Sequence, residues 1–483
     1  MSDPRNCSIV WFRQDLRLAD NPVLSAALRC GSRVLPVFVL DEHAAGLWAP
    51  GGAQRWWLHH SLAALSHDLR QRGAGLVLRR GSADEIIPEL AKAVGAGTVH
   101  AMRCIEPWAR RQEQRVSRAV EADGVRLILH QSATLFDPDS VRTHTGTPYR
   151  IYTHFARAYR NLSPPGNPQP APDRIPAIGI CRSDKLADWH LLPTNPDWAG
   201  GLRENWQPGE TGAMRRLKNF LTERVNCYDK DRDWPDRDGT TKLSPHLHWG
   251  EISVATVWHA AQHDGSLSRA REKLLGELLW REFAANLLWH NPHLPDHCLR
   301  PEFQHMPWRH DSAALHAWQR GRTGIPIVDA GMRQLWHTGW MHNRVRMVVA
   351  SFLTKHLLLP WQDGEAWFWD TLVDADLANN STNWQWVAGC GADAAPFFRV
   401  FNPVLQGQKF DPEAAYVRAW VPELRRLGAK QIHAPWQAPP LVLKAAGVAA
   451  RSFIPVSNRR SGRRAAASIG GAPIVATITG VVP

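Results

Sequence analysis

Two apolar stretches near the start of the chain, SIVWFR (Ser8–Arg13) and RVLPVFVL (Arg33–Leu40), have the length and composition of buried β-strands. A stretch with helical apolar spacing follows at Gln54–Arg72, and short apolar runs alternate with helical stretches as far as Leu129. Such alternation is typical of a parallel, doubly wound sheet with helices on both faces. We therefore predict a Rossmann-like α/β domain over residues 1–131, although no G-x-G-x-x-G dinucleotide fingerprint follows the first strand.

The rest of the chain has a different composition. Residues 132–208 include a proline-rich stretch, Leu162–Ile178, that cannot form a regular helix or a central strand, so we expect an interdomain linker. From residue 209 the apolar spacing is helical, which predicts a large all-α domain over residues 209–436. Residues 437–483 lack an amphipathic pattern and are expected to form a mobile tail, with a basic nucleic-acid-binding arm or a localisation signal as the alternative.

Charge and tryptophan content point to a polyanionic partner. The 57 Lys and Arg residues exceed the 45 Asp and Glu residues, which gives a net charge of +12 in a chain of 483 residues. A basic protein of this kind commonly binds nucleic acid, and an ordinary basic enzyme is the alternative. The 24 tryptophans, most of them after residue 200, indicate stacking surfaces for bases or for a planar cofactor, although many must be core.

Several classes of protein are disfavoured. A hydrophobic fraction of 44% argues against disorder, and no apolar run approaches the ~20 residues that span a bilayer, so we expect no membrane association. The first residues lack the apolar core of a signal peptide, which favours a cytoplasmic protein. The 7 cysteines are scattered without a CxxC pair, which argues against a disulfide framework and a structural zinc site.

Two predicted helices, at Arg269–Trp289 and Trp340–Leu358, carry unusual polar faces. Their residues share a face by i, i+3 and i+4 spacing, and they are Glu277, Trp280 and Arg281 in the first helix and Asn343, Arg346 and Met347 in the second. For the first face there are two interpretations: a helix at the boundary of the core with an Arg–Glu ion pair, or part of a functional site. A buried amide beside an arginine and a thioether would line a polar cofactor pocket, and a hydrogen-bonded core asparagine is the alternative.

Three short segments add groups that suit a nucleotide. The loop Gly239–Ser244 (GTTKLS) offers hydroxyls before a helix, which suits a phosphate, although such residues are often only helix caps. Asp374 and Asp376 can accept hydrogen bonds from ribose, an amide or an arginine, and no metal-ligand spacing accompanies them. Asn383–Trp386 (NWQW) places two indoles in a turn-like segment. Together the segments predict a nucleotide-type cofactor pocket beside a nucleic-acid surface.

Ordered motifs then reveal a resemblance to a known family. They include WFRQDLRLADNP, GTTKLSPHLHWGEIS, ELLWREF, TGWMHNRVRM, DADLANN, NWQWVAGCGADAAPFFRVFNP and QGQKFD. Over about residues 8–436 the chain resembles the photolyase–cryptochrome family, and most of all the class I photolyases for cyclobutane pyrimidine dimers. The resemblance implies an α/β domain, a helical domain that binds FAD, used as FADH⁻, and UV-damaged DNA as the partner of a monomer. It implies a light-dependent carbon–carbon lyase.

The resemblance also implies roles for individual residues. The positions that match the flavin pocket are Tyr228, Thr240, Thr241, Leu243, Ser244, Glu277, Arg281, Trp340, Asn343, Arg346, Asp374, Asp376 and Asn380. Asn380 would lie beside flavin N5, and Arg346 would stabilise the anionic ring. The catalytic positions would be Glu277, Asn343 and Asn380 together with an electron-carrying tryptophan chain of Trp308, Trp361 and Trp384. No metal is expected.

A further set matches positions that contact DNA or the dimer: Arg232, Glu277, Trp280, Arg281, Asn343, Arg344, Met347, Trp386, Arg399, Gln406 and Lys409. Photolyases flip their target out of the helix, and Trp280 and Trp386 would stack on the flipped dimer. Glu277 would hydrogen-bond the dimer and stabilise its radical anion. The arginines and Lys409 would contact backbone phosphates.

Comparison by position favours repair of the cyclobutane dimer. Photolyases for the (6–4) photoproduct carry histidines where this chain has Asn343 and Met347, certain cryptochromes have tyrosine at Trp386, and plant cryptochromes have aspartate at Asn380. A cryptochrome-like blue-light photoreceptor is one alternative, and a flavin-containing nucleic-acid-binding protein without repair activity is another. The sequence does not determine the antenna chromophore: deazaflavin, folate, another flavin and no antenna at all are the alternatives.

Overall fold

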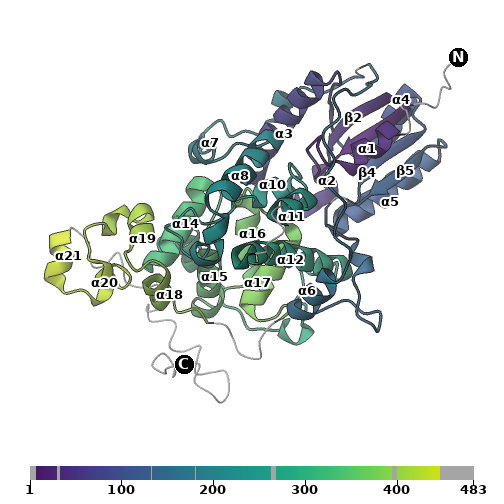
Figure 1. Ribbon diagram of the computed structural model, residues 1–483. Coiled ribbons are helices and arrows are strands. Elements are labelled where there is room, and N and C mark those ends of the chain that lie inside the picture. The colour runs from purple at the N-terminus through teal and green to yellow at the C-terminus, as the bar shows by residue number, and fades with distance from the viewer. Residues whose placement is uncertain are drawn as a thin grey trace.

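Five parallel strands form one sheet in the order β3-β2-β1-β4-β5, with β1 at its centre (Figure 1). The computed structural model describes residues 7–29, 33–131, 133–179, 181–262, 268–393 and 400–446. The strands of this sheet are β1 (Cys7–Phe12), β2 (Arg33–Leu40), β3 (Val77–Arg80), β4 (Thr98–Met102) and β5 (Arg126–His130). The parallel order confirms the predicted doubly wound α/β fold.

Helices cover both faces of the sheet, which explains why β1 and β2 read as continuous apolar runs. The helices of this part are α1 (Pro22–Arg29), α2 (Glu42–Ala45), α3 (Gly52–Gln71), α4 (Ala83–Val94) and α5 (Pro107–Glu121). Val10 and Phe12 pack with residues of α1 and α3 on one face. Ile9 and Trp11 pack with residues of α4 and α5 on the other. Alternate side chains of one strand therefore enter two separate cores.

The connecting segment runs along the open edge of the sheet before it reaches the helical part. It contains α6 (Tyr152–Arg160) and α7 (Gly200–Asn205). Its proline-rich stretch is extended, and the amide of Val34 donates to the carbonyl of Pro176 at 2.8 Å while the amide of Ile178 donates to the carbonyl of Val34 at 2.9 Å. Because β3 pairs only with the second half of β2, this stretch supplies the missing backbone partners of Val34.

All the regular elements that the structure describes after residue 200 are helices. Helices α12, α16 and α17 lie at the centre of this part, and α17 packs against both α12 and α16 (Figure 1). The helices after α7 are α8 (Glu210–Glu223), α9 (Tyr228–Asp231), α10 (Ser244–His248), α11 (Val254–Gln262), α12 (Arg269–His290), α13 (Ser312–Gln319), α14 (Pro326–Thr338), α15 (Asn343–Ser351), α16 (Trp361–Thr371), α17 (Leu377–Ala388), α18 (Pro403–Phe410), α19 (Ala415–Trp420), α20 (Ala429–Ile432) and α21 (Pro440–Ala446). This confirms the predicted all-α second part.

Two local predictions were wrong. The helix expected over Trp340–Leu358 begins only at Asn343, because the side chain of His342 caps it by accepting from the amide of Arg344. It then passes into a π-helical turn and ends before Leu358, whose φ is +56°. The NWQW segment is not a turn but lies inside α17, which is buried on several sides and so shows no amphipathic period.

The α/β and helical parts meet in a close contact at Gly250. A Cβ at this position would lie 2.0 Å from the carbonyl oxygen of Gln14, and the backbone has a φ of +64° that favours glycine. The amide of Leu16 donates to the carbonyl of Trp249 at 3.1 Å. This contact brings the carboxyl end of β1 against α10, so the two parts can share the walls of one pocket.

Candidate cofactor and nucleic-acid site

A polar network joins three of the residues expected to hold a flavin. Ser244 Oγ donates to Asp374 Oδ2 at 2.6 Å, and Arg346 Nη2 donates to the same carboxylate at 2.9 Å. Arg346 also donates through Nε to the carbonyl of Met341 at 2.8 Å, which fixes its guanidinium. The network connects the start of α10, α15 and the turn before α17. A charged pair of this kind beside free hydroxyls can orient a polar cofactor.

The hydroxyl loop has an unpaired group. Thr240 Oγ1 is buried without a hydrogen-bond partner, whereas Thr241 Oγ1 accepts from the amide of Leu243 at 3.2 Å. Leu243 is buried in the helical core and anchors the loop. Tyr228 is also buried, and Arg232 lies over its ring at 5.3 Å. An orphaned buried hydroxyl next to a helix start fits a phosphate oxygen of a nucleotide cofactor.

Trp340 closes one side of this region. It is 9% exposed and packs with the core that includes Trp249 and Val373. Lys242 Nζ lies 5.5 Å from its ring centroid, in a cation–π contact. The family resemblance placed Trp340 at the flavin, and its position beside the hydroxyl loop is compatible with that role.

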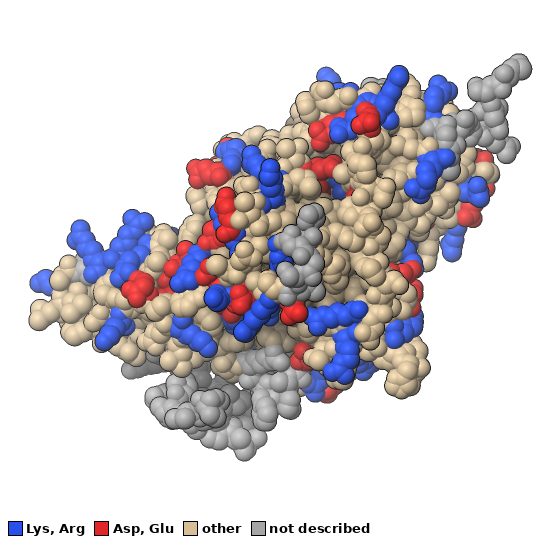
Figure 2. Space-filling model, in the orientation of Figure 1, with Lys and Arg blue, Asp and Glu red and all other residues tan. Residues whose placement is uncertain are grey.

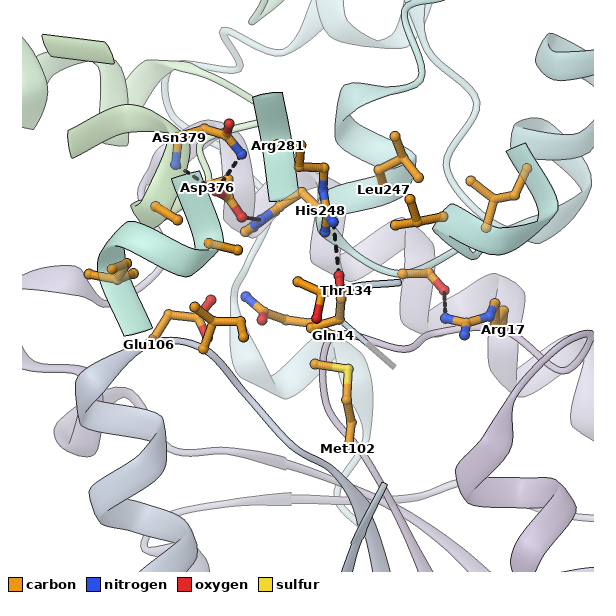
Figure 3. Close-up of a pocket in the computed structure, with 18 residues that line it drawn as sticks. Gln14, Arg17, Met102, Glu106, Thr134, Leu247, His248, Arg281, Asp376 and Asn379 are labelled. Carbon is orange, nitrogen blue, oxygen red and sulfur yellow. Dashed lines mark hydrogen bonds and ion pairs between the residues drawn. The ribbon is translucent and has the colours of Figure 1, made fainter. Parts of the chain in front are cut away.

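Arg281 and Asp376 line a pocket between the two parts of the molecule (Figure 3). Asp376 Oδ2 lies 3.7 Å from His248 Nδ1, and Arg281 Nη1 donates to the carbonyl of Ala133 at 2.8 Å. Burial opposes the charged form of Asp376, but the nearby His248 and Arg281 outweigh burial and lower the pKa of this carboxyl. Asp376 also caps α17 by accepting from the amide of Asn379 at 2.8 Å.

The α/β part contributes the opposite wall of the pocket. Figure 3 shows Gln14 and Glu106 facing the His248 side, with Met102 below them. Glu106 Oε2 is buried without a hydrogen-bond partner, and burial, with the charge of Asp376, raises the pKa of Glu106. An unpaired buried carboxyl of this kind is a functional-site candidate.

Helix α12 presents the predicted dimer-contacting residues. Arg232 Nη1 donates to Glu277 Oε1, and the Glu277 side chain stays 30% exposed. Trp280 stacks on Tyr152 with ring centroids 3.5 Å apart and planes 5° from parallel. Sequence reasoning missed Tyr152, which lies in the segment assigned to a linker. The aromatic spacing of YTHFARAY in α6 is the signal that could have found it.

The face predicted on α15 is only partly buried. Asn343 is exposed, so the expectation of a buried amide was wrong, because this residue is the first of the helix and its side chain leaves the core. Met347 is half-buried on the same face. Arg344 Nη2 donates to Asp233 Oδ1 at 2.9 Å, and its guanidinium lies 4.4 Å from the Phe410 ring.

The three residues of the tryptophan chain lie on segments that are joined to one another. Trp361 and Trp384 are buried, and Trp308 is half-buried. A Cβ on Gly364 would lie 2.1 Å from Trp384 Cη2, so this ring packs on α16 one turn after Trp361. The amide of Arg309 donates to the carbonyl of Leu358 at 2.8 Å, which joins the Trp308 segment to the start of α16.

Asn380 is held by a residue that sequence reasoning missed. Its Nδ2 donates to the carbonyl of Glu365 at 3.0 Å, and the Asn380 side chain is buried. Burial raises the pKa of Glu365 well above its ordinary value, and Glu365 Oε1 has no hydrogen-bond partner. The sequence around Glu365 reads as an ordinary helix, so only its burial reveals it.

The remaining predicted DNA contacts lie at the end of α17 and on α18. Trp386 lies 6.5 Å from Phe401, with ring planes tilted by 30°. Gln406 Oε1 is buried without a partner, and Lys409 is exposed. Arg399 lies outside the described residues, as does most of the expected tail. Figure 2 shows basic side chains gathered at the end of the molecule formed by α18–α21.

The part of the chain that the structure describes contains neither a cluster of metal-ligating side chains nor a membrane-spanning helix. Within it, no group of three or more His, Cys, Asp or Glu side chains could hold a metal ion. None of its helices combines the length and the apolar character needed to cross a membrane.

Comparison with known proteins identifies the family. The description "DNA photolyase" matches residues 8–173, and "FAD binding domain of DNA photolyase" matches residues 274–463. A "Deoxyribodipyrimidine photo-lyase" of Agrobacterium fabrum is 49% identical, over 91% of this chain and 92% of its own. "Cryptochrome-1" of Arabidopsis thaliana is 36% identical, over 93% of this chain and 68% of its own. The chain therefore belongs to the photolyase–cryptochrome family.

Solved structures agree with this assignment. A bacterial class III photolyase from Agrobacterium tumefaciens superposes with a TM-score of 0.90 and 47% identity, over 94% of this chain and 95% of its own. A cryptochrome of Synechocystis sp. PCC6803 gives a TM-score of 0.84 and 29% identity, over 92% of this chain and 94% of its own.

Proposed function

We propose that this protein is a deoxyribodipyrimidine photolyase that binds cyclobutane pyrimidine dimers in DNA and splits them in blue light with reduced FAD. The observation that carries the proposal is the arrangement of α12. One turn of this helix presents Glu277 and Trp280, and Arg281 of the same turn lines the pocket shared with Asp376. A helix that joins a polar cofactor pocket to a partly exposed carboxylate and indole can couple the two sites.

The residues present fit FAD. Thr240, Ser244 and Arg346 would hold its phosphates and polar groups, since Thr240 has an unpaired buried hydroxyl and the other two converge on Asp374. Asn380 would face flavin N5. Reduced FAD supplies the light-driven electron that opens the dimer. The remaining residues that match flavin and DNA positions would serve in the same sites, and residues 209–436 would form the FAD- and DNA-binding domain.

Side chains of this protein would position the dimer and the DNA backbone. Trp280, backed by Tyr152, offers a stacked aromatic surface on which a flipped base can lie, a contact worth about 1–3 kcal/mol per base. Glu277 is held by Arg232 and can accept or share a hydrogen bond with the dimer while charge develops on it. Lys409 and Arg344 would neutralise backbone phosphates near the lesion.

Finer points are also proposals. The expected class I assignment has no support from the comparisons, because the structure with a TM-score of 0.90 is that of a class III photolyase. We also propose a second, light-harvesting chromophore of deazaflavin or folate type. One solved relative, an archaeal photolyase from Sulfolobus tokodaii, contains two FAD molecules. A cytoplasmic monomer completes the proposal.

The test uses two defined oligonucleotides, one with a cyclobutane thymine dimer and one with a (6–4) lesion. The protein is first reduced chemically and then illuminated or kept dark. Restored thymines on the dimer alone, and only in light, would support the proposal. Flavin that is bound and reduced without repair of either lesion would favour a cryptochrome-like photoreceptor, the alternative supported by 36% identity with Cryptochrome-1.

A further inference from the structure

A polar cavity lies between α8 and the hydroxyl loop, and of its wall the proposed function uses Thr241 alone. The cavity has a volume of about 150 Å³, whereas one water needs only ~10–15 Å³. Its wall carries three arginines, Arg215, Arg216 and Arg224, and the polar side chains of Gln207, Asn219 and Thr241. No carboxylate of the described residues belongs to this wall, so its chemistry suits an anion.

Helix α8 forms one side of the cavity. Residues of the wall recur at intervals of four and so share one face of this helix and its end: Gly212, Arg216, Phe220 and Arg224. A Cβ on Gly212 would lie 2.0 Å from the carbonyl oxygen of Gln207, so the glycine lets the segment before α8 pack directly onto this face. Phe220 is buried in the helical core and holds the helix in place. The arginines therefore stand on a fixed support.

Arg216 is held in position before any ligand binds. Its guanidinium carbon lies 5.0 Å from the ring centroid of Trp206, in a cation–π contact, and its Nη2 donates to the carbonyl of Asn205 at 3.4 Å. Trp206 is itself buried, and its Nε1 donates to the carbonyl of Thr338 at 2.7 Å. A guanidinium that rests on an anchored ring loses little further freedom when it binds an anion.

The positive charge around the cavity is only partly neutralised by the protein. Arg224 Nη1 lies 2.9 Å from Asp238 Oδ2, but the same carboxylate also pairs with Lys242 Nζ at 2.8 Å. Within the described part of the chain, Arg215 and Arg216 form no ion pair with a carboxylate. Burial lowers the pKa of Arg216, and the charges of Arg215 and Arg224 act in the same direction against Asp238. A bound anion would relieve this repulsion.

The donors around the cavity favour a phosphate group over a carboxylate. A guanidinium presents a planar fork that matches phosphate oxygens, and a phosphate monoester carries a charge of about −1.5 to −2 at pH 7 with three acceptor oxygens. Several arginines can therefore share one phosphate, whereas a carboxylate offers a single charge and two oxygens. The side-chain amides of Gln207 and Asn219 supply further donors.

We propose that the cavity between α8 and the hydroxyl loop is a second anion site that binds a phosphate group through Arg215, Arg216 and Arg224. The phosphate belongs to a small molecule, free phosphate or a phosphate monoester, or to the DNA backbone. Thr241 lies in both this wall and the loop assigned to FAD, so a bound phosphate would join α8 to that loop. The site goes beyond the proposed function, because repair of a dimer does not require it.

The test is a calorimetric titration of the full-length protein with inorganic phosphate, with chloride at equal ionic strength as the blank. We expect saturable binding at one site. Arg216→Ala and Arg215→Ala should each weaken it by about tenfold, because a charge-assisted hydrogen bond is lost. Lys218→Ala removes an equal charge from an exposed position of α8 outside the cavity wall and should change nothing. No saturable binding, or an equal loss in Lys218→Ala, would overturn the site.

A second titration identifies the source of the phosphate. Thymidine 5′-monophosphate and undamaged duplex DNA are each added as competitors of inorganic phosphate. We expect the monophosphate to compete and the duplex to leave the affinity unchanged, because the proposed DNA contacts lie on α12, α15, α17 and α18 rather than on α8. Competition by the duplex, with weaker duplex binding in Arg216→Ala, would assign the phosphate to the DNA backbone. Binding of inorganic phosphate that neither competitor displaces would restrict the site to the free ion.

Failure of this site can be told from failure of the proposed function and from misfolding. Phosphate binding without repair of the thymine dimer overturns only the proposed function, and repair without phosphate binding overturns only the site. Thermal melts show whether Arg216→Ala, which loses its contact with Trp206, still folds. Arg215 is exposed, so Arg215→Ala leaves the core intact and decides the matter if Arg216→Ala does not fold.

Discussion

At the scale of the residue, the stacking role of Trp386 can be separated from general DNA binding. Trp386→Ala should weaken binding of dimer-containing duplex by about 1–3 kcal/mol, because it removes one of two surfaces for the flipped dimer. Binding of undamaged duplex should change little. Fluorescence anisotropy with both duplexes measures the two affinities, and Trp336→Ala, which removes a 59% exposed indole, is the matched control. An equal loss on both duplexes would refute the stacking role.

Single residues also show which features of the site could be predicted from the sequence and which could not. The spacing of Asp374 and Arg346 predicted polar groups for a cofactor, but only the fold shows that Ser244 joins them on one carboxylate. Asn343 was wrongly predicted to be buried, because the first residue of a helix and an interior residue look alike in the apolar pattern of a sequence. Tyr152 and Glu365 were missed because their roles depend on burial against segments distant in the sequence.

At the scale of the element, α16 has a glycine where Trp384 packs. Gly364→Ala should displace this ring, because the new Cβ would lie 2.1 Å from Cη2, and should slow flavin photoreduction while lowering the thermal midpoint. In α12 the matched change Gly276→Ala places its Cβ 3.8 Å from the Tyr152 hydroxyl oxygen and should stabilise the helix by up to about 1 kcal/mol. Thermal melts and illumination kinetics measure both. Normal photoreduction in Gly364→Ala would contradict the packing argument.

Helix α12 also carries a pH-sensitive anchor. Glu282 is buried, Tyr159 donates to it, and the amide of Leu135 donates to its Oε2 at 3.0 Å. Burial raises the pKa of Glu282 to about 7, above its unfolded value near 4.5. The folded state therefore holds a proton that the unfolded state has lost, so stability falls as pH rises from the lower to the higher value, by about 3 kcal/mol in all.

Glu282→Gln should remove that pH dependence, because the amide stays neutral at every pH. Unfolding by denaturant at several values between about pH 5 and 8 gives the free energy of unfolding for both proteins. The difference between the variant and the original should grow toward the alkaline end. Parallel curves would show that Glu282 does not titrate in this window.

The strands were easier to predict than the helices of the second part. β2 was predicted with both ends correct because strands covered on both faces become unbroken apolar runs. The NWQW segment of α17 was predicted to be turn-like because buried polar residues of this helix, Asn380, Ser381 and Gln385, interrupt the apolar period. Asn380 contacts Glu365 of α16 and Gln385 contacts the segment after α12, and the sequence does not reveal these partners.

At the scale of the whole molecule, the excess of basic side chains should make DNA binding strongly dependent on salt. Affinity for undamaged duplex should fall steeply as salt rises, because bound counterions are released from the phosphates. Lys409→Ala should weaken damaged and undamaged duplex alike and reduce the slope of log affinity against log salt by about 1. Lys92→Ala, in α4 of the α/β part, is the control. A change confined to damaged DNA would instead place Lys409 at the lesion.

The proline-rich stretch that pairs with Val34 determines where the chain can be truncated to give a stable α/β fragment. A fragment that stopped at residue 131 would leave the first half of β2 with open backbone groups, the kind of edge that recruits another strand and drives aggregation. It would also lose Ile175, Trp189 and Leu191 from the core under the sheet. The sheet and its core are complete only when the connecting segment that leads to the helical part is present. The smallest independent folding unit of the α/β part therefore extends past residue 191.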